Sequence, residues 1–259
     1  MRRFFVDEIK GKEGPFAIKG QEAKHIKRVL RLGPGDRFIL FDGKGSRFQA
    51  VIESTGSREV IALLEKPLPL PPTSPVELFL CQALLKSAAM DDVIRKTSEL
   101  GVDRIFPFSS ERTVIRLNHD QLPAKRKHWQ EIAKSAAKQA DRTRPAEIAP
   151  PTAFRDLIEE KGSEETLRVI LWEGEDTDDL KGLLRLSPPS RRFIGFIGPE
   201  GGFTEKEIEE ARKRGVISVS LGYRVLRADT AAMTMVALVQ YEWGDLSLGN
   251  PSFKPGVMA

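Results

Sequence analysis

A proline-rich segment divides the chain into two regions of different pattern. Five prolines fall within residues 67–75, and each proline fixes its own backbone and biases the preceding residue toward extended geometry. The segment is therefore predicted to be a stiff linker. We expect one domain over residues 1–72, a second over residues 73–245, and a loose tail over residues 246–259, where Gly and Pro recur without periodicity.

The first region predicts a small β-rich barrel or sheet with one helix. Residues 38–41 and 48–52 are apolar and β-prone, and a glycine-containing turn separates them, which indicates a hairpin. Residues 22–32 instead carry apolar side chains at helical spacing, and the Gly33-Pro34-Gly35 sequence is expected to stop this helix.

The second region alternates between strand-like and helical patterns. Apolar runs predict strands at residues 76–84, 104–108, 167–172, 193–197 and 216–221. Apolar side chains at helical spacing predict helices at residues 90–100, 123–140, 204–215 and 231–243. A capping box opens the third helix at Thr204. This alternation favours an α/β fold with a mostly parallel sheet.

The composition is that of an ordinary globular protein, 40% hydrophobic and 30% charged. No apolar run is long enough to span a bilayer, and acidic residues directly follow the basic start, so we expect neither a membrane span nor a signal peptide. The single cysteine, Cys81, lies in an apolar run. It excludes an internal disulfide framework and favours a buried thiol in a reducing, cytoplasmic location.

The basic residues are unevenly distributed. Residues 1–72 hold 14 Lys and Arg against 9 Asp and Glu, although the whole chain carries only +4. A second surplus, 9 basic against 3 acidic residues, lies between Arg112 and Arg144. Both stretches suit contact with a polyanion such as RNA. Ordinary solvated faces are the alternative, and charge alone leaves both open.

A glycine-rich turn follows one predicted buried strand: Gly198-Pro199-Glu200-Gly201-Gly202. Ligands of open α/β sheets bind beyond the carboxyl ends of strands, which is where this turn lies. It lacks the spacing of nucleotide phosphate loops, and Glu200 would repel a phosphate. The turn therefore favours a cofactor without phosphates, held through backbone hydrogen bonds. A tight strand-to-helix connection without a ligand remains the alternative.

Two further strand ends resemble this one in position. Residues 221–231 include Arg224 and Arg227 on either side of apolar residues, an arrangement that can hold an anionic substrate. The alternative is that both arginines form ion pairs with nearby acids such as Glu205 or Glu207. Residues 171–175 form the third strand end, and together the three loops predict a cleft. Asp229 or Thr230 is expected to cap the helix that follows Arg227.

Other kinds of catalytic site find no support in the sequence. The three histidines, His25, His119 and His128, fall in or near basic helical stretches rather than at strand ends, so no catalytic triad is expected. No spacing of His, Cys and carboxylates indicates a metal site. The dinucleotide fingerprint of nicotinamide dehydrogenases is also missing.

The two strand-end motifs together resemble the SPOUT class of methyltransferases. Residues 197–204 and 220–231 carry the resemblance, and the match is closest to the ribosomal RNA small subunit methyltransferase E family (RsmE), which methylates N3 of a uracil in 16S rRNA. Supporting motifs occur at residues 1–5, 25–31, 96–102, 110–114 and 129–133. The resemblance extends from residue 1 to about residue 245.

The resemblance implies a PUA-like RNA-binding β-barrel, followed by a SPOUT-type α/β domain with a C-terminal trefoil knot. It implies S-adenosyl-L-methionine as cofactor, no metal, a homodimer, and 16S rRNA or the small ribosomal subunit as partner. The cofactor contacts carried over are Leu171, Gly198, Glu200, Gly201, Leu221, Gly222, Leu226 and Ala231. The basic residues expected to contact RNA are Arg2, Arg3, Lys24, Lys27, Arg28, Arg31, Arg112 and Arg142.

For catalysis, our hypothesis is that Arg224 or Arg227 stabilises the developing uracilate oxygen or an adjacent phosphate. Glu200 and Asp229 are interpreted as loop-shaping and helix-capping residues rather than bases. Two positions depart from the family pattern: Tyr223 replaces an expected proline, and Ala228-Asp229 replaces an expected Thr-Glu. A ribose 2′-hydroxyl or a transfer-RNA base as methyl acceptor, and an RNA-binding assembly factor without activity, remain alternatives.

Overall fold

The computed structural model describes residues 1–116, 118–159 and 165–246, arranged as two compact units. The first unit contains Met1–Pro72 together with Ala137–Pro145, and the second contains Thr73–Ala136 and the chain from Ala146 onward. Ala137–Pro145 thus lies inside the range that the sequence predicted for the second domain. The predicted tail, beyond Leu246, lies outside the described residues.

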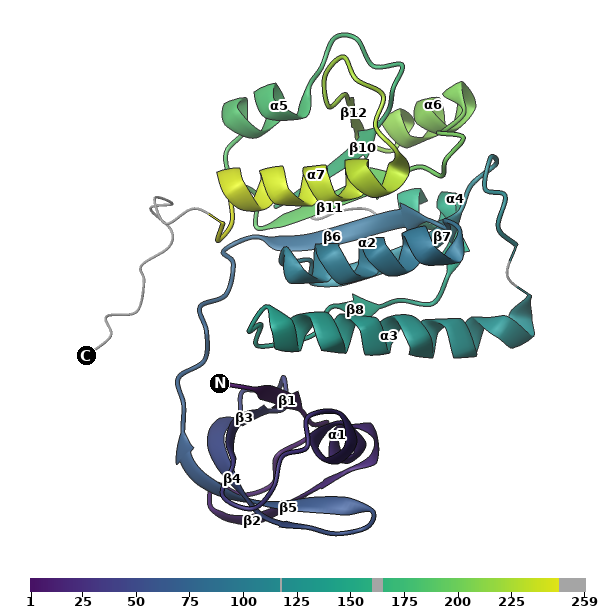
Figure 1. Ribbon diagram of the computed structural model, residues 1–259. Helices are drawn as coiled ribbons and strands as arrows, with labels where there is room; N and C mark the ends of the chain where they lie inside the picture. The colour runs from purple at the N-terminus through teal and green to yellow at the C-terminus, as the bar shows by residue number, and fades with distance from the viewer. Residues whose placement is uncertain (117, 160–164, 247–259) are drawn as a thin grey trace. The chain divides into compact units, whose positions relative to one another are not determined.

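The first unit is built on a mixed five-stranded sheet, in which the strand order is β1-β3-β4-β5-β2. The strands are β1 (Arg3–Phe5), β2 (Gly14–Lys19), β3 (Arg37–Phe41), β4 (Arg47–Thr55) and β5 (Glu59–Pro67). Only the β1–β3 pair is parallel. The hairpin predicted from the apolar runs is β3–β4 and is confirmed. Two irregularities in the β4–β5 register allow this sheet to bend (Figure 1).

The predicted helix of this unit is shorter and less regular than expected. It consists of α1 (Gly20–Lys24) and a π-helical turn, η1 (His25–Val29). The helix therefore ends before Gly33. The chain turns at Arg31, whose φ of 52° is rare for a residue with a side chain. Aromatic and aliphatic side chains fill the core beneath α1 and η1, including Phe4, Ile26 and Phe38.

A buried carboxylate fixes the β3–β4 turn. Burial raises the pKa of Asp42, but the backbone amides of Lys44, Ser46 and Ile9 donate hydrogen bonds to it and hold this pKa below its usual range. The charged Asp42 carboxylate thus accepts the backbone hydrogen bonds that hold the turn.

Ion pairs hold the Ala137–Pro145 segment within the first unit. Arg3 Nε lies 2.8 Å from the Asp141 carboxylate, and Arg47 Nη2 donates a 3.0 Å hydrogen bond to that carboxylate. Lys138 Nζ lies 2.6 Å from Glu22 Oε1. The guanidinium of Arg3, which was predicted from the sequence to contact RNA, is thus paired with Asp141.

The second unit is a parallel α/β domain. Its strands are β6 (Glu77–Ala83), β7 (Arg104–Ser109), β8 (Glu147–Ile148), β9 (Thr152–Ala153), β10 (Thr166–Leu171), β11 (Arg192–Ile197) and β12 (Ile217–Val219). They follow the order β12-β10-β11-β6-β7-β8. Strand β9 also pairs with β7, farther along that strand than β8 does, and all described pairs are parallel. The predicted parallel α/β fold is confirmed.

Helices cover both faces of this sheet (Figure 1). They are α2 (Ser87–Glu99), α3 (Leu122–Gln139), α4 (Phe154–Glu159), α5 (Leu180–Leu186), α6 (Glu205–Lys213) and α7 (Ala228–Glu242), with a 3-10 turn, η2 (His119–Gln121). Side chains of α2, α5 and α7 share one apolar core with the sheet, and those of α4 and α6 share the other. Alternate residues of each strand feed the two cores, which explains the continuous apolar runs.

Some elements differ from the sequence prediction. The strands β8 and β9 and the helices α4 and α5 were not predicted, because such short elements carry too little periodicity. The predicted capping of α7 by Asp229 or Thr230 is wrong. The helix begins at Ala228, with Arg227 at the N-cap position, and the Asp229 carboxylate accepts a hydrogen bond from the Thr230 amide inside the first turn.

The strand order brings distant loops together. Strand β11 lies between β10 and β6, and β12 lies on the other side of β10. The carboxyl ends of these four parallel strands therefore meet at one edge of the sheet. The trefoil knot concerns how the chain is threaded and stays a prediction. Across the described ranges, no helix combines the length and apolar character needed to cross a membrane.

Candidate functional site

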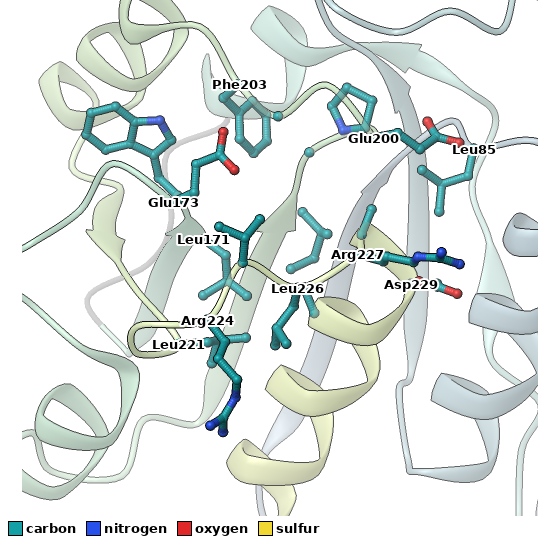
Figure 2. Close-up of a pocket in the computed structure, with 18 of the residues that line it drawn as sticks. Leu85, Leu171, Glu173, Glu200, Phe203, Leu221, Arg224, Leu226, Arg227 and Asp229 are labelled. Carbon is teal, nitrogen blue, oxygen red and sulfur yellow. The ribbon is translucent and has the colours of Figure 1, made fainter.

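A cavity of about 450 Å³ lies where the four strand ends meet (Figure 2). Its size falls within the roughly 300–1,000 Å³ of small-molecule sites. The loops after β6, β10, β11 and β12 all contribute to its lining. The three loops identified in the sequence are thus brought together, and the loop after β6 is a fourth wall.

Two positions of the loop after β11 favour glycine. A Cβ atom on Gly198 would lie 3.1 Å from the Phe203 ring, and Gly202 has a φ of +69°, which disfavours any side chain. The Gly202 amide donates a 2.9 Å hydrogen bond to the Pro199 carbonyl and closes a turn. Phe203 packs against Phe108 in the core below. The glycine-rich motif is therefore a tight turn that forms one wall of the cavity.

Residues of the loop after β7 brace this turn from outside. Arg112 Nη1 donates a 2.9 Å hydrogen bond to the Gly201 carbonyl, and the Glu111 amide donates to Glu207 Oε1, also at 2.9 Å. Glu207 belongs to the predicted capping box with Thr204, which is confirmed. Gly201 does not line the cavity, because it faces Arg112 instead. Arg112, expected to contact RNA, thus supports the glycine-rich turn.

The side chain of Glu200 joins two walls of the cavity. Its Oε1 atom lies 3.4 Å from the Lys86 amide, which is at the start of α2. This contact matches the loop-shaping role expected for Glu200. Lys86 and its neighbours Leu85 and Ala89 line the cavity but were missed from the sequence. The only signal was their position directly after a buried strand, since this loop contains no glycine.

Arg224 and Arg227 lie in the loop after β12, and both line the cavity. Figure 2 shows their guanidinium groups extending in different directions from the loop. Both residues are exposed, and no ion pair or hydrogen bond to another described residue engages either guanidinium. The alternative of pairing with Glu207 is not observed, because that carboxylate is already held by Thr204 and Glu111. Two guanidinium groups without a partner among the described residues therefore lie beside the cavity.

The chemistry of the lining fits a cofactor that has an aromatic ring and a cationic group. Apolar side chains, including Leu171, Leu221 and Leu226, form part of its wall, and Ala231 is added from α7. Carboxylates come from Glu173, Glu200 and Asp229. Within the described residues, no group of His, Cys, Asp and Glu side chains is arranged to hold a metal ion.

The remaining basic residues predicted to contact RNA fall into two groups. Lys27 is tethered, since its Nζ atom donates to the Gly56 and Ser57 carbonyls, and Arg2 donates to the Leu30 carbonyl. Arg142 is half-buried. Exposed residues of α1, η1 and the following turn form the second group: Lys24, Arg28 and Arg31.

The parallel sheet, its strand order and the cavity at its strand ends define an α/β domain with a ligand-sized site at one edge of the sheet. The family model described as "RNA methyltransferase domain" matches residues 72–240, and "RNA methyltransferase PUA domain" matches residues 18–65. The chain belongs to this RNA methyltransferase family. The fold class and the family expected from the sequence motifs are confirmed.

Relatives cover nearly the whole chain. A Ribosomal RNA small subunit methyltransferase E from Bacillus subtilis is 27% identical over 93% of this chain and 97% of its own length. The Mesomycoplasma hyopneumoniae protein of the same name is 31% identical, over 91% and 97%. A crystal structure of such an enzyme from Neisseria gonorrhoeae, bound to S-adenosyl methionine, has a TM-score of 0.87 at 29% identity and covers 95% of this chain and 100% of that one.

Proposed function

We propose that this protein transfers a methyl group from S-adenosyl-L-methionine to N3 of a specific uridine in the 16S rRNA of the small ribosomal subunit. The observation that carries the proposal is the cavity at four strand ends, which is lined by a glycine turn and by two arginines that have no ion-pair partner among the described residues. Family membership supports RNA methylation, and the names of the relatives support small-subunit ribosomal RNA.

Most of the predicted cofactor residues line this cavity: Leu171, Gly198, Glu200, Leu221, Gly222, Leu226 and Ala231. The leucines suit the adenine ring, and the Glu173 carboxylate suits a cationic group. Gly222, with a φ of +94° and open space around it, leaves the backbone accessible to a ligand. When bound, S-adenosyl-L-methionine supplies an activated methyl group on a sulfonium.

The protein's own part in the reaction is electrostatic. The N3 proton of uracil must pass to solvent as the methyl group moves from the sulfonium to N3, so negative charge develops on the base. No ion pair or hydrogen bond to another described residue engages the guanidinium of Arg224 or Arg227, and a guanidinium beside that charge lowers the barrier. One arginine would stabilise the uracilate oxygen, and the other would hold an adjacent phosphate. Glu200 accepts a hydrogen bond from the Lys86 amide and shapes its loop, and Asp229 accepts one from the Thr230 amide inside the first turn of α7.

The first unit, which contains the five-stranded sheet, would bind the RNA backbone. Lys24, Arg28 and Arg31 are exposed on or next to one short helical segment, and cations there can neutralise phosphates. We further propose a homodimer in the cytoplasm. The fully exposed Tyr223 and largely exposed Val225, beside the cavity, support a partner surface there.

The decisive experiment maps methylated nucleosides in ribosomal RNA by mass spectrometry, in cells with and without this protein. The expected result is the loss of one 3-methyluridine from 16S rRNA without the protein and its return with the purified protein and S-adenosyl-L-methionine. A missing ribose methyl group or a changed transfer RNA would contradict the acceptor. Calorimetry that detects no cofactor binding would favour a non-catalytic assembly factor.

A further inference from the structure

The loop after β10 is held by a buried carboxylate just outside the cavity. The Glu175 side chain is only 4% exposed, and its Oε2 atom lies 2.5 Å from Arg212 Nη2 on α6. Its Oε1 atom accepts hydrogen bonds from the Thr177 hydroxyl at 2.6 Å and the Thr177 amide at 3.2 Å. Burial raises the pKa of Glu175, but these donors outweigh burial and lower this pKa to about 2. A buried carboxylate with this many donors fixes the loop that carries it.

The same arginine also touches the wall of the cavity. Arg212 Cζ lies 5.5 Å from the centre of the Trp172 ring, a cation–π arrangement. The ring also lies against Gly174, where a Cβ atom would approach within 2.6 Å of it. Trp172 therefore has little freedom to move while Arg212 and Gly174 are in place. We name Trp172, Glu175, Thr177 and Arg212 the clamp.

The clamp acts on residues that line the cavity. Trp172 and Glu173 are lining residues, whereas Glu175 and Arg212 are not. Figure 2 shows Glu173 between the loops after β10 and β11, and its Oε1 atom lies 3.3 Å from where a Cβ on Gly202 would be. Helix α6 begins directly after the β11 loop and carries Arg212 near its end. One helix thus connects two walls of the cavity.

We infer that Arg212 is a positioning residue for cofactor binding, acting through Trp172 and Glu175 to hold the loop after β10 in its binding geometry. The inference rests on the proposed function, since it takes the cavity to be the S-adenosyl-L-methionine site. The physical reason is preorganisation: a loop that is already ordered loses less conformational entropy when the ligand binds. Arg212 itself does not line the cavity.

Calorimetric titration with S-adenosyl-L-methionine and with S-adenosylhomocysteine tests this directly. Arg212→Ala is expected to weaken both affinities about tenfold or more, as for a lost charge-assisted hydrogen bond. The KM for S-adenosyl-L-methionine should rise in step, whereas kcat at saturating cofactor should change less than about threefold. Arg212→Lys keeps the charge but not the planar stack, so its affinities should lie between those of wild type and Arg212→Ala.

Two further variants separate positioning from folding. Arg155→Ala removes the ion pair between Arg155 on α4 and Glu210 on α6; neither residue lines the cavity, so this variant should bind both ligands as wild type does. Glu175→Gln keeps the shape of the side chain and should weaken binding in the same direction as Arg212→Ala. Trp172 fluorescence gives a second readout, because Trp129 and Trp243 are buried in the core on the other face of the sheet.

The outcomes are distinguishable. If wild type binds the cofactor and folded Arg212→Ala and Glu175→Gln bind it equally well, the clamp is structural only and the inference is wrong. If Arg212→Ala does not fold, Glu175→Gln and Arg212→Lys decide by the same criterion. If wild type binds neither ligand, the proposed function fails first and the inference fails with it.

Discussion

The loops on the two sides of the cavity are held very differently. On one side, the loops after β10 and β11 are tied to neighbouring elements by Glu175–Arg212, Arg112–Gly201 and Glu200–Lys86 contacts. On the other side, the loop after β12 exposes Tyr223, Arg224 and Val225. Its guanidinium groups have no partner among the described residues.

This difference matches the two tasks of a methyltransferase. A small cofactor gains affinity from walls that are already ordered, because less conformational entropy is lost on binding. A cation that must contact RNA should instead be unpaired, because an existing ion pair would have to be broken first. The held loops therefore suit the cofactor, and the unpaired arginines suit the RNA.

The sharpest way to break this comparison is to remove the unpaired arginines. Arg224→Ala and Arg227→Ala are each expected to lower turnover about 100- to 1,000-fold, the usual effect of losing one group that stabilises developing charge. Cofactor affinity, measured separately by calorimetry, should change little. Arg185→Ala is the matched control, since it removes an exposed Arg185–Glu242 ion pair away from the cavity. Wild-type turnover in both arginine variants would sink the catalytic assignment.

A larger side chain in the loop after β11 should instead lower cofactor affinity. Gly198→Val places new methyl groups against Phe203 and the Gly202 backbone, both within about 3.3 Å of the first added carbon. Cofactor affinity is expected to fall about 10- to 100-fold, because the turn must shift to relieve the contact. Gly33→Ala, where nothing lies within 4 Å of the new carbon, serves as the control in calorimetry. Unchanged affinity in Gly198→Val would mean that this turn is not a cofactor wall.

The pH dependence of stability should report the Glu175 contact. The pKa of this carboxyl is about 2 in the folded protein against an ordinary value of 4.5. Its contribution is therefore complete above pH 4.5 and is lost as pH falls from 4.5 toward 2, because the unfolded chain binds the proton first. Glu175→Gln should lose on the order of 2 kcal/mol of unfolding free energy at neutral pH and less in acid. Urea titrations at several pH values check this; a constant difference between the two proteins would contradict it.

The smallest expected effect concerns RNA binding by the first unit and extends the comparison between free and engaged cations to it. Arg28 is exposed, whereas Lys27 donates to the Gly56 and Ser57 carbonyls. Arg28→Ala should weaken binding of a 16S rRNA fragment severalfold and reduce the slope of log affinity against log salt by about 1. Lys27→Ala should leave that slope unchanged. Equal slopes for the two variants would show that internal pairing does not decide which cations bind RNA.

Long elements were predictable because their periodicity is strong. The strands β6, β10 and β11 and the helices α2 and α3 were expected close to their observed bounds, as was the β3–β4 hairpin. The two-residue strands β8 and β9 were missed because two residues carry no alternation. The start of α7 was misplaced because Asp229 resembles a cap in sequence, although its side chain accepts hydrogen bonds from the amide and hydroxyl of the next residue, Thr230, inside the first turn.

The candidate site was predictable where glycine marked it. Gly198, Gly222 and the two arginines stood out in the sequence and line the cavity. Leu85, Lys86 and Ala89 did not, because a loop without glycine resembles any other strand end. The partners of charged residues were likewise hidden: Arg3 and Asp141 are 138 positions apart, and only folding pairs them.

The sequence by itself determined the parallel α/β architecture, the glycine turn and the motifs that place the chain among RNA methyltransferases, because these depend on local periodicity and on residue types at short spacing. Only the tertiary structure decided which cations are free and which loops are held. That choice depends on contacts between residues such as Arg212 and Glu175, which are brought to 2.5 Å by the packing of α6 against the sheet. A charged side chain carries the same formal charge with or without an ion-pair partner, but an internal partner leaves it less available to bind a ligand.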